Sequence, residues 1–503
     1  MLNPKSLKAA SVALALSMAI TATSCAAIDA RESASDDTNK STSIGSDTSD
    51  YTAAPVSADD INIEQEIMSS GDGDHAIQSD GQTESLSNVK IIKTGDSDAG
   101  DEADFYGDNS AVFATNQATL TLTNMIIDTN GKHANAVFSY GEGTTVNISN
   151  SVITTEGNCS GGLMTTGGGK TNASNLSIHT TGNSSAAIRS DRGGGTVNVD
   201  GGTYTTDGVG SPAIYSTADI TVSNAKLEST SSQGVVVEGD NSVTLNNVDL
   251  TADNNSKNSD KSPYYQAVMI YQSMSGDADE GTASFSMNGG SINNANGDIF
   301  FVNNTVTNIT MEGVTVNNKD TSGVFLRAAA AGWGSEGSNG GNVNLTLKGQ
   351  TLTGDIVTDE ISAINMYLTS GSSYEGTVNG DNSGKVYMEI ESGSTWTLTG
   401  DSYITALTCD KDGIVLNGHK LYVNGVEYQE GSASTGDAIE LTSGSSSGSG
   451  HGQRPDKPDG ERPPEGEDGK PGDTPPDGNP GKPGDTPPDG NSGDTPPSKP
   501  DQE

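Results

Sequence analysis

The stretch LTLTNMIIDTNG (residues 120–131) returns almost unchanged in pattern as VNISNSVITTEG (residues 146–157). Each copy alternates apolar and polar residues, turns at an Asn, adds a second apolar run and ends at a Gly. Further copies begin at Thr171, Val197, Ile220, Val243, Phe285, Ile309 and Leu345, so the successive steps are 26, 25, 26, 23, 23, 42, 24 and 36 residues. A self-similar period of about two dozen residues predicts a solenoid built from one coil per repeat.

The pattern inside each repeat predicts parallel strands. Alternation turns one face of each strand into a narrow interior, and Gly and Asn supply the positive φ angles of the corners. Recurring asparagines are expected to stack their amides from coil to coil (Asn124, Asn150, Asn175, Asn224 and Asn247). We therefore predict an all-β fold, a single-stranded right-handed parallel β-helix. A β-propeller or a stack of sandwiches is the alternative, but these folds prefer longer repeats with antiparallel hairpins.

Proline marks the boundaries of this solenoid. Fourteen of the 18 prolines lie from Pro455 onward, and only Pro212 and Pro263 fall between residues 56 and 454. Because proline breaks a strand ladder, we expect the β-helix over residues 59–440. Residues 25–58 then form a flexible spacer, and residues 441–503 form a disordered tail in which GKPGDTPPDGN repeats at 469–479 and 481–491. Shorter coils are expected after about residue 350, with LYVNG (residues 421–425) at the end.

The N-terminus predicts export. Lys5 and Lys8 precede an apolar run from Ala9 to Ala22, which is typical of a signal peptide over residues 1–24 and too short for a spanning helix. The segment ATSC (residues 22–25) resembles the lipobox of bacterial lipoprotein precursors, although the family pattern prefers Leu where Ala22 stands. This resemblance implies a lipid on Cys25; plain secretion is the alternative.

Charge and cysteine content narrow the classes of partner. The net charge of -42 repels nucleic acid and anionic lipid surfaces, so no nucleic-acid partner is expected and the membrane is reached only through the lipid. The remaining cysteines, Cys159 and Cys409, are too far apart in sequence for a disulfide scaffold, and both are expected to be small buried side chains. The histidines show no metal-ligand spacing and receive no predicted role.

The combination of lipoprotein signal, Gly/Asn/Thr-rich coils and acidic Pro-rich tail resembles the β-helical, adhesin-like surface lipoproteins of Gram-positive gut bacteria. Phrases such as DFYG (residues 104–107), AIRSDRG (187–193), GSPAIYSTAD (210–219) and MIYQSMSG (269–276) carry this resemblance over about residues 60–430. The wider pectate-lyase-like superfamily shares the coil and includes lyases, glycosidases, sugar-binding proteins and adhesins, so fold alone does not decide the function.

Aligned coils place a column of side chains on the outer face of one sheet. The column contains Phe138, Met164, Arg189, Tyr215, Val237, Met269, Phe301 and Leu326, and the column two positions on contains Tyr140, Thr166, Asp191, Thr217, Gly239, Tyr271, Asn303 and Ala328. Aromatic faces with a few polar groups suit sugar rings. The predicted ligand-binding residues are Phe138, Tyr140, Arg189, Asp191, Tyr215, Tyr271 and Trp333. The alternative is that an inserted loop, at 251–266 or 329–342, covers this stripe.

A second hypothesis assigns chemistry to Arg189, Asp191 and Arg192. A β-helix polysaccharide lyase removes a proton beside a uronate carboxylate with a basic residue, helped by a cation. Only Asp191 and Glu238 lie near the column, whereas a lyase needs several converging carboxylates and an inverting glycosidase needs a spaced pair. No catalytic residue is assigned unless the protein is an enzyme, in which case these three are the candidates.

The segment DSDAGDEADFYGD (residues 96–108) is the richest in acid. Alternate aspartates in a Gly-containing loop can supply the oxygens that Ca²⁺ takes, which makes Asp96, Asp98, Asp101 and Asp104 the candidate ligands. The order departs from an EF-hand loop, and a solvated acidic loop is the alternative. No other cofactor is expected.

Together these features predict a monomeric protein on the outer face of the cell membrane, or secreted, that binds a glycan or a surface protein of a host or neighbouring cell. A polysaccharide lyase or glycoside hydrolase on the same fold is the first alternative. A structural spacer that binds nothing is the second.

Overall fold

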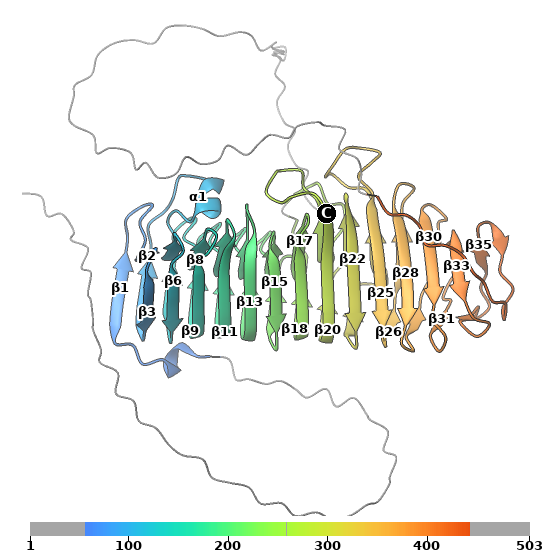
Figure 1. Ribbon diagram of the computed structural model, residues 1–503, viewed down its shortest axis with the longest axis horizontal. Helices are drawn as coiled ribbons and strands as arrows, with labels where there is room; N and C mark the ends of the chain where they lie inside the picture. Colours follow the sequence, from blue (N-terminus) through green and yellow to red (C-terminus); the bar gives the residue numbers. More distant parts are fainter. Residues whose placement is uncertain (1–55, 258, 443–503) are drawn as a thin grey trace, which may run out of the picture. The chain divides into compact units, whose positions relative to one another are not determined.

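The computed structural model describes residues 56–257 and 259–442. In this part of the chain the strands stack side by side along one long axis (Figure 1). The predicted signal peptide, Cys25, most of the spacer and nearly all of the tail lie outside the described residues. The described fold is an all-β solenoid, a parallel β-helix, as predicted.

Eighteen strands form the larger sheet. They are β1 (Gln65–Ser69), β3 (Thr83–Ser87), β4 (Val89–Lys93), β6 (Thr119–Thr123), β7 (Ile126–Thr129), β9 (Thr145–Thr155), β11 (Gly169–Thr180), β13 (Gly195–Thr206), β15 (Asp219–Ser223), β16 (Lys226–Ser229), β18 (Ser242–Ala252), β20 (Thr282–Asn294), β22 (Thr305–Glu312), β23 (Thr315–Asn318), β25 (Gly341–Lys348), β28 (Ala363–Thr369), β30 (Lys385–Ile390) and β33 (Ala406–Cys409). Pairing in this sheet is parallel, and it follows the predicted repeat through every coil: Leu120 pairs with Val146, and Ile309 pairs with Leu345. The register of this sheet is therefore confirmed.

Eleven strands form the second sheet, which carries the outer face discussed below. They are β2 (Ile77–Asp80), β5 (Val112–Thr115), β8 (Val137–Tyr140), β10 (Leu163–Thr166), β12 (Ile188–Ser190), β14 (Ile214–Ser216), β17 (Val235–Glu238), β19 (Gln266–Tyr271), β21 (Asp298–Asn303), β24 (Val324–Ala328) and β27 (Asp355–Thr358). Short strands in consecutive coils leave room for wide loops between the sheets.

Two small sheets complete the solenoid. One contains β26 (Thr351–Thr353), β29 (Ser373–Glu375), β31 (Thr395–Thr397) and β34 (Ile414–Val415); the other contains β32 (Ser402–Ile404), β35 (Leu421–Val423) and β36 (Val426–Glu427). The β35–β36 hairpin is the one antiparallel pairing between named strands in the described residues. Its turn is Asn424-Gly425, both with positive φ. The parallel pairing elsewhere excludes the propeller and sandwich alternatives for this part of the chain.

The interior explains how a chain with 31% hydrophobic residues can fold. In β9 the side chains alternate between buried and partly exposed positions, so each strand contributes only a few side chains to a narrow core. Trp396 and Phe300 lie in this core without solvent exposure. The indole nitrogen of Trp396 donates to the Gly376 carbonyl at 3.0 Å.

Asparagines occupy the corners, as predicted. Asn124, Asn150, Asn175, Asn224 and Asn247 all have positive φ between 48° and 55°. The amide of Asn175 donates to Asn150 at 2.9 Å, and that of Asn247 donates to Asn224 at 3.0 Å. Asn tolerates this conformation better than other non-Gly residues, and its side chain bonds the same residue in the next coil.

Helix is almost absent from the described residues. A 3₁₀ turn (Ala58–Asp60) precedes the first strand, and α1 (Asp101–Tyr106) lies between β4 and β5. The sequence predicted an acidic loop where α1 stands, so that prediction was wrong over these residues. Over residues 56–257 and 259–442 no helix combines the length and apolar character needed to cross a bilayer.

Candidate functional site

The outer face of the eleven-stranded sheet carries the predicted column with two corrections. Pairing runs from Phe138 through Met164, Arg189 and Tyr215, then to Val236, Met269, Phe301 and Arg327. Val237 and Leu326, which the sequence placed on the outer column, have no solvent exposure and lie in the inner core. The Val235–Val237 run gives no alternation signal, and the ladder shifts register between Val324 and Leu326.

The column two positions further on is offset by one residue from its prediction at the same two strands, β17 and β24. Glu238, rather than Gly239, pairs with Tyr271, and Ala329, rather than Ala328, packs on the outer face. Ala328 belongs to the core. The correction places a buried carboxylate on the outer face, where the sequence predicted a glycine.

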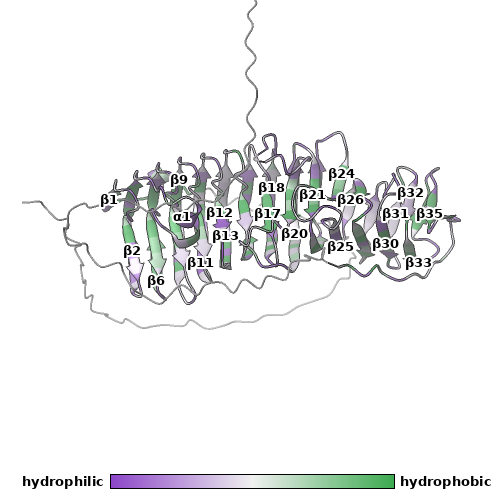
Figure 2. Ribbon diagram, turned by 90° about the horizontal axis from the view of Figure 1, so that it is seen from above, coloured by the Kyte–Doolittle hydropathy of each residue, from purple (hydrophilic) through white to green (hydrophobic). Residues whose placement is uncertain are grey.

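One end of the aromatic stripe is covered by α1. In Figure 2 this helix lies over the stacked coils. Thr166 donates to the carbonyl of Phe105 at 2.7 Å, and the rings of Tyr106 and Tyr140 lie 5.9 Å apart. Phe138 packs with Phe113 and Met164 and has no exposed surface. Phe138 was therefore wrongly predicted to be an open ligand-binding side chain, because the covering element is an insertion outside the repeat.

The other end is covered by two loops. Tyr264 packs edge-on against Phe301 with ring centroids 5.3 Å apart, and Trp333 packs against Tyr271 at 5.0 Å. These residues belong to the insertions that the sequence identified as possible covers. Figure 1 shows α1 and these loops on the same side of the stack. The stripe is thus covered at both ends, and Trp333 lies against the solenoid.

A cavity of about 290 Å³ lies between the two covers. Its lining includes Asp101 and Phe105 from α1, Arg189, Asp191, Tyr215 and Tyr271 from the sheet face, and Asp277 from the loop after β19. A second, smaller cavity of about 110 Å³ shares Tyr215 and Tyr271 with the first and continues along Met269, Tyr264 and Trp333. The predicted residues Arg189, Asp191, Tyr215, Tyr271 and Trp333 therefore line two neighbouring spaces.

Arg189 is held by two carboxylates. Its guanidinium lies 3.1 Å from Asp104 and 2.9 Å from Asp191, and it also donates to the Ser184 carbonyl at 3.4 Å. Burial opposes the charge, but Asp104 and Asp191 raise the pKa of Arg189 further above its usual range. A guanidinium held protonated in this way cannot accept a proton, which argues against Arg189 as a general base.

The two carboxylates have opposite pKa shifts. Burial raises the pKa of Asp191 to about 6, although Arg189 opposes this shift. Burial also acts on Asp104, but Arg189 and His133 outweigh it and hold its pKa below the usual value. Asp191 therefore takes up a proton as the pH falls to about 6, whereas Asp104 remains an anion there.

Arg192 is paired as well. It lies 2.7 Å from Asp277, and its guanidinium stacks 3.9 Å from the Phe105 ring centroid. Asp277 lies 85 residues away in sequence. No local sequence pattern indicates this pairing, because only the fold of the loop brings Asp277 to this face.

Glu238 organises the two tyrosines between the cavities. The hydroxyls of Tyr215 and Tyr271 donate to its carboxylate at 2.5 and 3.0 Å, and Ser273 donates to its other oxygen. Burial is the largest cause that raises the pKa of both tyrosines well above 10. Both hydroxyls therefore remain protonated and stay oriented by Glu238.

The four aspartates predicted to bind calcium do not converge. Asp104 faces Arg189, Asp96 accepts from the backbone of Lys132, and Asp101 lines the cavity. Asp98 is exposed. Across residues 56–257 and 259–442, the one group of three potential metal ligands that includes any of them is Asp104, His133 and Cys159.

That group was missed in the sequence. His133 was given no role, and Cys159 was expected to be fully buried, whereas it is partly exposed beside Asp104. Cys409 is buried, as expected. A signal did exist: His133 and Cys159 are 26 residues apart, which is one coil, and they occupy the same corner with φ of 56° and 57°.

Comparisons of the chain with protein-family models, with curated proteins and with solved structures found no match.

Proposed function

We propose that the outer face between α1 and the two loops binds an uncharged, hydroxyl-rich glycan. The observation that carries the proposal is the pair of adjoining cavities, one polar and lined by carboxylates, the other lined by Met269, Tyr264 and Trp333. Carboxylates accept hydrogen bonds from sugar hydroxyls, and aromatic rings pack on the apolar faces of sugar rings.

Charge favours a neutral sugar over a uronate. Both arginines near the polar cavity are already paired with carboxylates, Arg189 with Asp104 and Asp191, and Arg192 with Asp277. A uronate entering this space would meet carboxylates and no unpaired cation among these residues. The net charge of -42 adds a long-range repulsion to the same effect.

The cellular setting of this proposal rests on the N-terminal sequence. We propose that the chain is exported and held by a lipid on Cys25 at the outer face of the cell membrane, as a monomeric, adhesin-like member of the pectate-lyase-like superfamily. The glycan would then belong to a host or neighbouring cell, free or on a surface protein.

A glycan array probed with the full chain, with and without Ca²⁺, tests the binding. We expect selective retention of neutral glycans that Ca²⁺ does not change, since the four aspartates are spread over different contacts. Tyr271→Ala should remove retention, because Tyr271 borders both cavities. Tyr403→Ala is the matched control, since Tyr403 stacks on Tyr422 in the small C-terminal sheet. Equal retention by both variants would refute the proposed site.

A second candidate is glycoside hydrolysis in the same cavity. Asp191, with its pKa raised to about 6, could serve as a general acid, and Asp277 lines the same space as a second carboxylate. This assignment differs from the lyase hypothesis, in which a basic residue, Arg189 or Arg192, removes the proton. Release of reducing sugar that is lost in Asp191→Asn would establish the enzyme, while an ultraviolet-absorbing unsaturated uronate product would restore the lyase hypothesis.

A further inference from the structure

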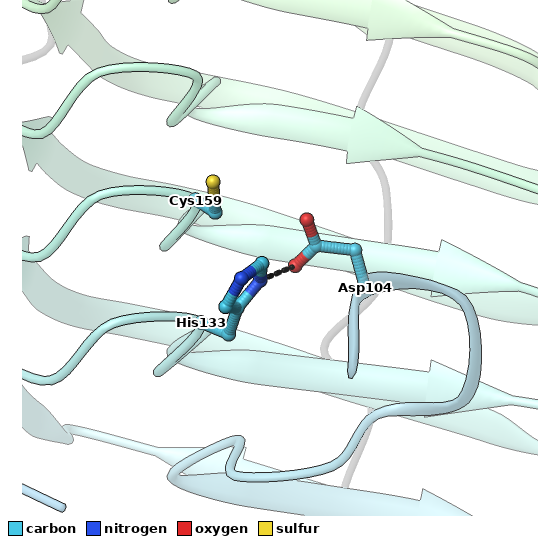
Figure 3. A group of neighbouring side chains, drawn as sticks. All are labelled: Asp104, His133 and Cys159. Carbon is cyan, nitrogen blue, oxygen red and sulfur yellow. Dashed lines mark hydrogen bonds and ion pairs between the residues drawn. The ribbon is translucent and has the colours of Figure 1, made fainter. Parts of the chain in front are cut away.

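Three side chains from three separate segments meet beside the cavity. Asp104 comes from α1, His133 from the turn after β7, and Cys159 from the turn after β9, one coil further on. One potential ligand atom from each lies within 4.8 Å of the other two. Figure 3 shows the His133 ring directed at the Asp104 carboxylate, with Cys159 in the adjacent coil.

We propose that Asp104, His133 and Cys159 bind a zinc ion that fastens α1 to two coils of the solenoid. The spacing fits: Nδ1 of His133 lies 3.2 Å from Oδ1 of Asp104. A tetrahedral ion with bonds of about 2.0–2.1 Å to nitrogen and oxygen separates these two ligand atoms by about 3.3–3.4 Å. Small side-chain adjustments would therefore suffice for these two ligands.

The ligand types select the metal. Thiolate, imidazole and carboxylate together suit Zn²⁺, whereas Ca²⁺ takes oxygen ligands. Asp104 is also oriented by its neighbours, because Asn135 donates to one of its oxygens at 3.1 Å and Arg189 contacts the other at 3.1 Å. Such outer contacts are what fixes a ligand's direction in protein metal sites.

The local charge balance also accommodates a divalent ion despite Arg189. With Cys159 deprotonated, Asp104, Asp191 and Cys159 carry three negative charges against the one positive charge of Arg189. A divalent ion neutralises the remaining two. Zinc binds Cys159 as the thiolate, so binding releases the thiol proton to solvent.

Three protein ligands leave a fourth coordination position for water, as in zinc sites that have only three protein ligands. The next corner of the stack belongs to Ser184, which lines the polar cavity. The zinc site thus adjoins the proposed glycan site but uses none of the sugar-binding tyrosines. The two proposals can fail independently.

Metal binding to the full chain, reduced and stripped with a chelator, tests the inference. Zn²⁺ is titrated against a chromophoric chelator, and we expect one ion per chain. Cys159→Ser should weaken binding at least about tenfold, because even outer-shell contacts are worth that much. Cys409→Ser is the matched control, since Cys409 is the other described cysteine and is buried at the C-terminal end.

Co²⁺ provides a readout that does not depend on the stability of the Cys159→Ser variant. The double variant Cys25→Ser, Cys409→Ser keeps Cys159 as the only one of the 3 cysteines. Co²⁺ added to it should produce the charge-transfer absorption of a cobalt–thiolate bond. Absence of that band, or unchanged zinc affinity in folded Cys159→Ser, would overturn the proposal.

Discussion

Replacing Asp104 by Ala should release α1 from the solenoid. Asp104 accepts from His133 at 3.2 Å and from Asn135 at 3.1 Å, and it neutralises Arg189 at 3.1 Å. The substitution leaves these buried groups without their acceptor, while Phe105 and the Thr166 hydrogen bond remain to hold the helix. Asp104 is therefore the main polar attachment of α1.

The magnitude follows from the buried ion pair. Removing one partner of such a pair costs about 3–5 kcal/mol. Arg189 keeps Asp191 and the Ser184 carbonyl, so the lower end applies. A loss of about 3 kcal/mol raises the population of undocked α1 on the order of 100-fold, since each 1.4 kcal/mol is about tenfold.

Hydrogen–deuterium exchange of the segment 99–108, measured in the presence of a chelator, reports this population. The amides of Ala103 and Gly107 are bonded within the segment and should exchange on the order of 100-fold faster, provided that opening is followed by rapid closing. β25 is the internal control, and Asp98→Ala, a change of an exposed carboxylate nearby, is the control variant. A rise of less than about threefold in Asp104→Ala, under ~0.7 kcal/mol, would refute the reasoning.

Three further outcomes are expected. The pKa of Asp191 is raised from 3.8 to about 6, so between these pH values the folded state binds more protons than the unfolded state. The contribution of Asp191 to stability therefore falls by up to about 3 kcal/mol as the pH rises through that window. Chemical unfolding of Asp191→Asn across pH 4 to 6 should lack that fall, and a pH profile of stability equal to that of the unmodified protein would contradict the prediction. Asn150→Ala should lower the free energy of unfolding by about 1–2 kcal/mol, because φ is 48° at this position and Ala disfavours the left-handed conformation. Asn150→Gly should lower it less, since Gly adopts this conformation readily. Equal losses in the two variants would show that the backbone conformation is not the cause. Glycan binding should change the fluorescence of Trp333, which lines the smaller cavity, but not that of the fully buried Trp396. Trp333→Phe should abolish the fluorescence change. A change that persists in this variant would place the ligand elsewhere.

The repeat was predictable because its causes are local. Alternating side chains and Asn corners recur in every coil, and each alignment step of the larger sheet was correct, including the longer steps of 42 and 36 residues. In the second sheet the predicted register is wrong at Val235–Val237, where three identical residues hide that Val235 and Val237 point inward and Val236 points outward. A register needs contrast between neighbouring residues, and that run has none.

The candidate site was predicted only in part. Arg189, Asp191, Tyr215 and Tyr271 were found because they belong to strands of the repeat. The elements that shape the cavity lie in insertions: α1 has only six residues and no stability of its own, so its sequence carries little helical signal. Asp277 and the group formed by Asp104 and His133 meet their partners only across these insertions.

The amino-acid sequence by itself determined the coil, its period and the residues that face outward over most of the stack, because hydrophobic alternation and turn chemistry act between near neighbours. The tertiary structure alone decided which outward residues are covered and which charges meet. Asp104 lies 85 positions before Arg189 in the sequence. No local pattern specifies their contact, since it depends on how an insertion folds back over coils formed by residues much later in the chain.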